Sequence, residues 1–249
     1  MTDTSLILIL GAALGGLVQG ISGSNFGMTS TAVWAWFLAP QLTAVLSLCG
    51  SLTGQIQAAF TLRRGWHWRR FLPFLVGGLL GIPLGVLLLP QLDVGLFKTA
   101  LGGLLVLACP ALLLAPNLPR IHHGGRFADG LTGLGGGILG GLGGYTGILP
   151  TLWGTLRGWP KDELRALVQN FNLGIQLVTL VAYLARGLIN RATLPSLALL
   201  IPVVLLSSWL GTRLYLGLSE ARFRQIVLIL LTVSGAALLV SGLTQWLAR

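Results

Sequence analysis

Long apolar runs fill most of the chain, and short polar or glycine-rich stretches separate them. Six of the runs are long enough to cross about 30 Å of hydrocarbon as helices. The six predicted spans are residues 42–62, 71–89, 96–115, 166–185, 194–216 and 226–243. Apolar and polar residues do not alternate along these runs, as they would in the strands of a membrane barrel. The pattern therefore predicts an all-α polytopic membrane protein.

Four further runs form two adjacent pairs, each with a glycine-rich tip between its members. The pairs cover residues 6–39 and 127–156, and each contains a run that is short or broken. A run of this kind is too short to cross the membrane. We expect each pair to be a broken helical hairpin that enters the membrane and returns on the same side.

The two halves of the chain repeat each other. Eight residue pairs recur in order at spacings from 120 to 126 residues, for example Gly27 with Gly147 and Pro40 with Pro160. Such a series indicates a duplicated unit of one hairpin and three spanning helices. The first repeat covers residues 1–116, a linker covers 117–126, and the second repeat covers 127–249. Three crossings is an odd number, so the second repeat should be inverted relative to the first.

The charges agree with this topology. Only 9% of the residues are charged, whereas soluble domains carry roughly 25%. If the loop at 63–70 is placed inside, twelve of the sixteen Lys and Arg residues lie inside and four outside. This bias predicts that both termini lie outside and that the hairpins enter from opposite faces. The net charge of +10 therefore reflects orientation in the membrane, and we expect no nucleic-acid partner.

The two hairpin tips carry the candidate chemistry. They read Gly23-Ser24-Asn25-Phe26-Gly27 and Gly144-Tyr145-Thr146-Gly147. A broken helix exposes backbone N–H groups, which a membrane tolerates where they line a cavity or a ligand. The N-terminus of a half-helix also carries a partial positive charge, and glycine lets an anion approach the N–H groups. Tips that enter from opposite faces should meet and form a pocket for a small anion.

The helix after each hairpin is polar in its middle, which is costly in a membrane unless the groups have partners. These side chains are either interhelical hydrogen-bonding groups or neutral walls of the same pocket. The predicted substrate-binding residues are Gly23, Ser24, Asn25, Phe26, Gly27, Thr29 and Gln55 in the first repeat and Gly144, Tyr145, Thr146, Gly147, Asn170, Asn172 and Gln176 in the second. The remaining glycines of the second hairpin, Gly133, Gly136, Gly137, Gly140 and Gly141, are predicted to allow close helix packing.

The cysteines, His122, His123 and Asp129 do not form a recognisable catalytic or metal-binding pattern. Cys49 and Cys109 are isolated in apolar runs, and His122 and His123 have no further ligands nearby, so we expect neither a metal site nor a cofactor. Asp129 lies at the start of a helix as an interfacial cap or a proton relay. The sequence contains no catalytic triad pattern or phosphate loop, so the chain is not predicted to be an enzyme.

Taken together, the order of these elements resembles the sulfite exporter TauE/SafE family, also called the toluene-sulfonate uptake permease family. The best-matching segments are GAALGGLVQGISGSNFGM, LGGGILGGLGGYTGILPTLWGTLRGWPKDELRALVQNFN and LSEARFRQIVLILLTVSG. The resemblance implies transport of sulfite, sulfonates or related organic anions across the bacterial inner membrane. The first tip departs from the family pattern of glycines ending in proline, whereas the second keeps Pro150.

We therefore predict a secondary transporter that moves a small sulfur-containing anion through the lipid bilayer by alternating access. A passive anion channel, an integral membrane enzyme and a membrane subunit without transport of its own are the alternatives. Protons as a coupling ion and a homodimer are left open.

Overall fold

The chain folds into a bundle of helices. The computed structural model describes residues 3–61, 68–117, 119–121, 123–213 and 220–247, and every regular element in these ranges is helical. The α-helices are α1 (Asp3–Ser22), α2 (Phe26–Trp34), α3 (Pro40–Thr61), α4 (Trp68–Leu88), α5 (Val94–Leu114), α6 (Gly125–Gly143), α7 (Ile148–Leu156), α8 (Lys161–Ala185), α9 (Leu194–Arg213) and α10 (Glu220–Leu247). Short 3-10 turns follow α4 at Leu89–Gln91 and α5 at Ala115–Asn117.

The predicted elements match these helices within a few residues at most ends. The six predicted spans correspond to α3, α4, α5, α8, α9 and α10, and the two predicted hairpins to α1–α2 and α6–α7. Both second arms of the hairpins, α2 and α7, are nine residues long. Residues 62–67, 118, 122 and 214–219, which include the ends of two predicted spans and parts of the basic loop and the linker, lie outside the described residues.

The hydropathy of the described helices differs from the predicted set of spans at two helices. Six described helices are long and apolar enough to cross a membrane, and these include α1 but not α3. The chain begins its first helix at Asp3, so α1 reaches a spanning length of 20 residues. Helix α3 is also long enough, with 22 residues, but its central polar side chains lower its hydropathy. Those side chains lie inside the protein.

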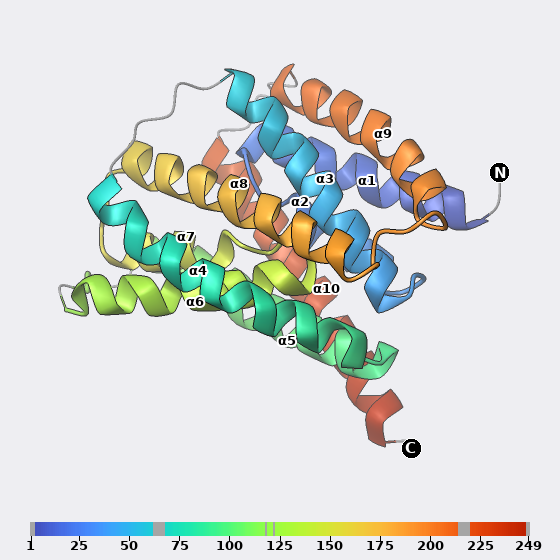
Figure 1. Cartoon of the computed structure of the whole chain (residues 1–249). Helices are drawn as coiled ribbons and strands as arrows, with labels where there is room; N and C mark the ends of the chain where they lie inside the picture. Colours follow the sequence, from blue (N-terminus) through green and yellow to red (C-terminus); the bar gives the residue numbers. More distant parts are fainter. Residues whose placement is uncertain (1–2, 62–67, 118, 122, 214–219, 248–249) are drawn as a thin grey trace.

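Three pairs of long helices pack side by side in the bundle. Helix α1 packs along α9, α4 along α6, and α5 along α10 (Figure 1). Helices α3 and α8 contact each other, and each also contacts helices of these pairs. The short helix α2 packs on α1 and α3, whereas α7 packs on α6 and α8.

Small residues allow these helices to approach closely. A side chain at Gly137 of α6 would overlap the backbone of Gly78 in α4, and one at Gly133 would overlap the backbone of Phe74. Gly136 and Gly140, on another side of α6, lie against α8 and the second hairpin tip. Lipid provides no hydrophobic drive for helix association, so close packing of small residues is a main source of stability. The predicted packing role of the α6 glycines is confirmed.

The polar side chains of α3 and α8 are buried within the protein. Ser47, Gln55, Asn172 and Gln176 each expose less than 5% of their surface. A polar group in lipid would lack partners, so burial between helices makes these residues compatible with a membrane. These polar side chains therefore lie in the interior of the bundle.

The α4–α6 contact provides a test of the packing. Gly137→Ala should destabilise the protein by about 1–3 kcal/mol, because the added methyl group overlaps the Gly78 backbone. Gly103→Ala in α5 is the matched control, since a methyl group there meets nothing within 4 Å. Thermal unfolding in detergent measures the difference. Equal melting temperatures for the two variants would contradict the described packing.

Candidate functional site

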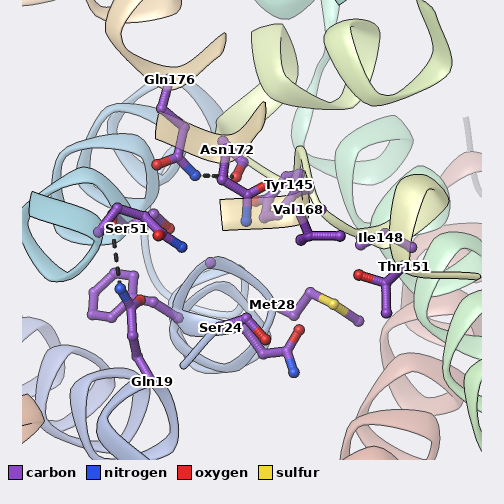
Figure 2. Close-up of a pocket in the computed structure, with 16 residues that line it drawn as sticks. Gln19, Ser24, Met28, Ser51, Tyr145, Ile148, Thr151, Val168, Asn172 and Gln176 are labelled. Carbon is purple, nitrogen blue, oxygen red and sulfur yellow. Dashed lines mark hydrogen bonds between the residues drawn. The ribbon is translucent and has the colours of Figure 1, made fainter. Parts of the chain in front are cut away.

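The two hairpin tips meet at a single cavity in the bundle. Residues 24–28 of the first tip and residues 144, 145, 147, 148 and 151 of the second line it together with side chains of α1, α3 and α8 (Figure 2). Its volume is about 40 Å³. A water-sized sphere needs about 10–15 Å³ on this measure, so the cavity holds roughly three of them. This is the size of a small inorganic ion.

The first tip is a turn that two residues in the left-handed region make possible. The chain leaves α1 at Gly23, with φ of 73°, and enters α2 through Asn25, with φ of 76°. The Gly23 N–H donates to Gln19 O over 2.7 Å and closes the last turn of α1. Asparagine tolerates a positive φ better than most side chains. No capping hydrogen bond from the Asn25 side chain to the start of α2 is present, so its amide remains at the cavity.

The second tip turns at Gly144, which has φ of 80°. The Gly144 N–H donates to Gly140 O over 2.8 Å, and Tyr145 N–H donates to Leu139 O over 3.2 Å. These bonds end α6, and α7 begins at Ile148. Pro150 lies in the first turn of α7, where its missing N–H removes no helical hydrogen bond.

Direct contacts hold the tips against each other. The Tyr145 hydroxyl and the Thr31 hydroxyl of α2 are 2.8 Å apart and hydrogen-bonded. The Tyr145 ring also lies next to Gly27, where a side chain would come within 3.1 Å of it. On the other side, the Ser47 hydroxyl of α3 donates to Gly143 O over 2.6 Å. The second tip is therefore fixed between α2 and α3.

The starts of α2 and α7 present backbone N–H groups at this cavity. The first helical bond of α2 runs from Thr29 N–H to Asn25 O, so the N–H groups of residues 26–28 precede it. All three of those residues line the cavity. In α7 the first such bond runs from Thr151 N–H to Gly147 O. Two helix N-termini at one cavity create a positive electrostatic potential without any charged side chain.

The side chains at the cavity are neutral. None of the lining residues is Asp, Glu, Lys, Arg or His. The Thr146 hydroxyl donates to Asn172 Oδ1 over 2.6 Å, so the Asn172 NH₂ group keeps its donors for other partners. Gln176 Nε2 donates to Gly144 O over 3.0 Å, whereas Gln176 Oε1 is buried without a partner among the described residues. The cavity thus offers several donors, and Gln176 Oε1 is an open acceptor that water or an acidic O–H group would satisfy.

Ten of the fourteen predicted binding residues line the cavity. They are Ser24, Asn25, Phe26, Gly27, Gln55, Gly144, Tyr145, Gly147, Asn172 and Gln176. The other four, Gly23, Thr29, Thr146 and Asn170, do not line it. Thr146 lies behind Asn172, and Asn170 is two residues from Asn172, which places it on another side of α8. The Thr29 hydroxyl is buried and has no hydrogen-bond partner in the described part of the chain.

The structure adds six lining residues that are absent from the predicted set. They are Gln19, Met28, Ser51, Ile148, Thr151 and Val168. Gln19 is an isolated amide in an apolar helix, a signal that could have identified it, and its Nε2 donates to Ser51 O over 3.3 Å (Figure 2). Met28, Ile148 and Val168 are apolar, and no sequence signal separates them from ordinary packing residues.

The other candidate reactive groups lie apart from the cavity. Cys109 is buried and Cys49 half-buried, and both are free thiols. No group of three potential metal ligands occurs among residues that the structure describes. Asp129 is buried within the protein, and its Oδ1 accepts a hydrogen bond from Trp153 Nε1 over 2.8 Å.

Six helices of membrane-spanning length and hydropathy indicate a multi-pass membrane protein, and a small cavity lies in its interior. The chain belongs to the sulfite exporter TauE/SafE family, whose model matches residues 8–238. It is also similar to a protein of Cupriavidus necator described as a probable sulfite/organosulfonate exporter TauE. The two chains are 28% identical over 245 residues, which cover 96% of this chain and 90% of the relative. No solved structure matches the chain significantly.

Family membership identifies the chain as a transporter rather than an enzyme. The predicted resemblance to this family is confirmed. The bundle, the broken hairpins and the neutral cavity therefore have to be understood as parts of a transport protein.

Access to the cavity can be tested without knowledge of the substrate. In a variant without Cys49 and Cys109, Ser24→Cys should react with a water-soluble thiol reagent, because residue 24 is half-buried at the cavity. Ser30→Cys is the matched control, since Ser30 is fully buried in α2. Mass spectrometry measures both labelling rates, and equal rates would contradict an accessible cavity.

Proposed function

We propose that the protein is a secondary transporter for a small sulfur oxyanion, with the cavity between the hairpin tips as its binding site. The observation that carries the proposal is the convergence of two helix N-termini on a cavity lined by neutral donors. Helix N-termini are favourable sites for anions, because their N–H groups and dipoles act together. Neutral donors also suit a transported ion, since a buried opposite charge would slow its release.

The substrate class follows from size, family and relative. The cavity of about 40 Å³ suits a compact oxyanion such as sulfite. A bulky aromatic sulfonate would need the cavity to widen. The Phe26 ring packs edge-on against Trp34 and the Tyr145 hydroxyl is bonded to Thr31, so contacts within the protein hold both aromatic side chains in place. Sulfite is also named in the description of the Cupriavidus necator relative.

Alternating access between two inverted repeats is the proposed mechanism. The packing supports it: α1 of the first hairpin lies on α9 of the second half, and α6 of the second hairpin lies on α4 of the first half. In the two repeats α1 corresponds to α6, α4 to α9 and α5 to α10. The α1–α9 contact is therefore equivalent to the α6–α4 contact, and the α5–α10 contact is equivalent to itself. Such a relation is the one expected for inverted repeats that rock around a central site in the bacterial inner membrane.

Asn25 allows the binding site to be tested. Asn25→Gly removes the side-chain amide and retains the positive φ, so the tip should keep its shape. We expect sulfite affinity to fall about 10- to 100-fold, because a hydrogen bond to a charged group contributes about 1.5–3 kcal/mol. Calorimetry in detergent measures the affinity. Asn117→Gly, at an exposed position, is the control, and an unchanged affinity in Asn25→Gly would remove the amide from the site.

Counterflow distinguishes a carrier from a passive channel. The liposomes are loaded with unlabelled sulfite and placed in labelled sulfite. With a carrier, the labelled sulfite inside should rise for a time above its final equilibrium level. Alternating access requires this, because the site returns faster when it is occupied. A channel gives no transient accumulation. If sulfite flux is saturable but labelled sulfite does not accumulate transiently, the carrier mechanism is rejected. The proposed anion site would still stand.

A further inference from the structure

A second group of donors lies beside the first hairpin tip, outside the residues that line the cavity. At Gly23, the position of an added Cβ would be 3.1 Å from Arg165 Nη2 and 3.7 Å from Gln169 Nε2. Both side chains come from α8. A guanidinium and an amide NH₂ group therefore converge on a residue without a side chain of its own. An acceptor oxygen at that position would lie within hydrogen-bonding distance of the Arg165 guanidinium.

Neither donor is used by the protein in the described ranges. Gln169 is 95% buried, with 5% of its surface exposed, and its Nε2 has no hydrogen-bond partner there. A buried donor without an acceptor costs about 1–3 kcal/mol, so the position favours an external acceptor. Arg165 is exposed and makes no described ion pair.

Nearby basic side chains are committed to other contacts. Arg70 pairs with Glu163 and lies 5.6 Å from the centre of the Trp159 ring. Arg157 donates to His123 O over 3.2 Å and lies over Trp153. Arg165 thus differs from these two residues, because its charge remains available to a solute.

The donors adjoin the central cavity. Gly23 precedes Ser24 and Asn25, which line the cavity from the first tip. On α8, Arg165 is one turn before Val168 and two turns before Asn172, which line the cavity from the other side. An anion at Gly23 would therefore lie next to the cavity and closer to the end of α8 that contains Lys161.

We propose that Arg165, Gln169 and Gly23 form an outer oxyanion subsite, from which the anion passes to the cavity. This inference rests on the proposed transport function and extends it. The distribution of Lys and Arg predicts that the start of α8 faces the cytoplasm. The subsite would then gather sulfite on the side from which an exporter takes its substrate. The exposed guanidinium attracts the anion over distance, and the buried amide fixes it near the tip.

Initial rates of radiolabelled sulfite uptake into inside-out membrane vesicles test the subsite. Arg165→Gln should raise KM about tenfold at low ionic strength and leave kcat almost unchanged, because the charge acts on capture and not on translocation. The difference should shrink at high salt. Arg165→Lys should recover part of the lost affinity, and Gln169→Leu should raise KM at both salt concentrations.

Lys161→Gln is the matched control, because it removes the same charge from the first turn of α8, where the side chain is exposed. Its KM should equal that of the wild type. An unchanged KM in Arg165→Gln, or an equal increase in Lys161→Gln, would overturn the subsite. If vesicles with the wild-type protein show no saturable sulfite uptake, the proposed function is rejected. This result differs from an unchanged KM in Arg165→Gln, which rejects only the subsite.

Discussion

This structure depends on one constraint: a backbone N–H group without a helical partner needs another acceptor inside a membrane protein. Lipid offers no acceptor, so an interrupted helix must end at a cavity, at another protein group or at a ligand. Here α2 and α7 begin at the same cavity, and each start leaves N–H groups ahead of its first helical bond. A negatively charged solute satisfies such groups and interacts favourably with both helix dipoles.

The remaining helices make this arrangement stable. Glycine contacts between α4 and α6 bring two backbones together, so the second hairpin has a fixed position. Ser47 and Gln176 then bind backbone oxygens of the second tip, at Gly143 and Gly144. Polar residues in α3 and α8 therefore have two roles: some fix the tip, and others remain at the cavity. A buried polar network of this kind gives a defined shape to a cavity whose lining residues carry no charge.

The sequence predicted the helices and both breaks, because apolar length and glycine-rich tips are local signals. Asn25 was also predictable, since a polar residue between two apolar runs needs a polar partner. Thr146 was assigned to the site, but it does not line the cavity and is hydrogen-bonded to Asn172, which does. The lining role of Val168 depends on how α8 is rotated in the bundle, which tertiary packing decides. The spanning length of α1 follows from its full helix bounds, whereas the lower hydropathy of α3 follows from its central polar side chains.

The most direct test of the account is a structure determined with selenite, an anomalously scattering analogue of sulfite. The account predicts a selenium peak in the cavity, within hydrogen-bonding distance of an N–H group of residues 26–28 and of the second tip. A peak confined to another part of the protein, or a cavity without selenite at concentrations that compete with sulfite transport, would contradict it.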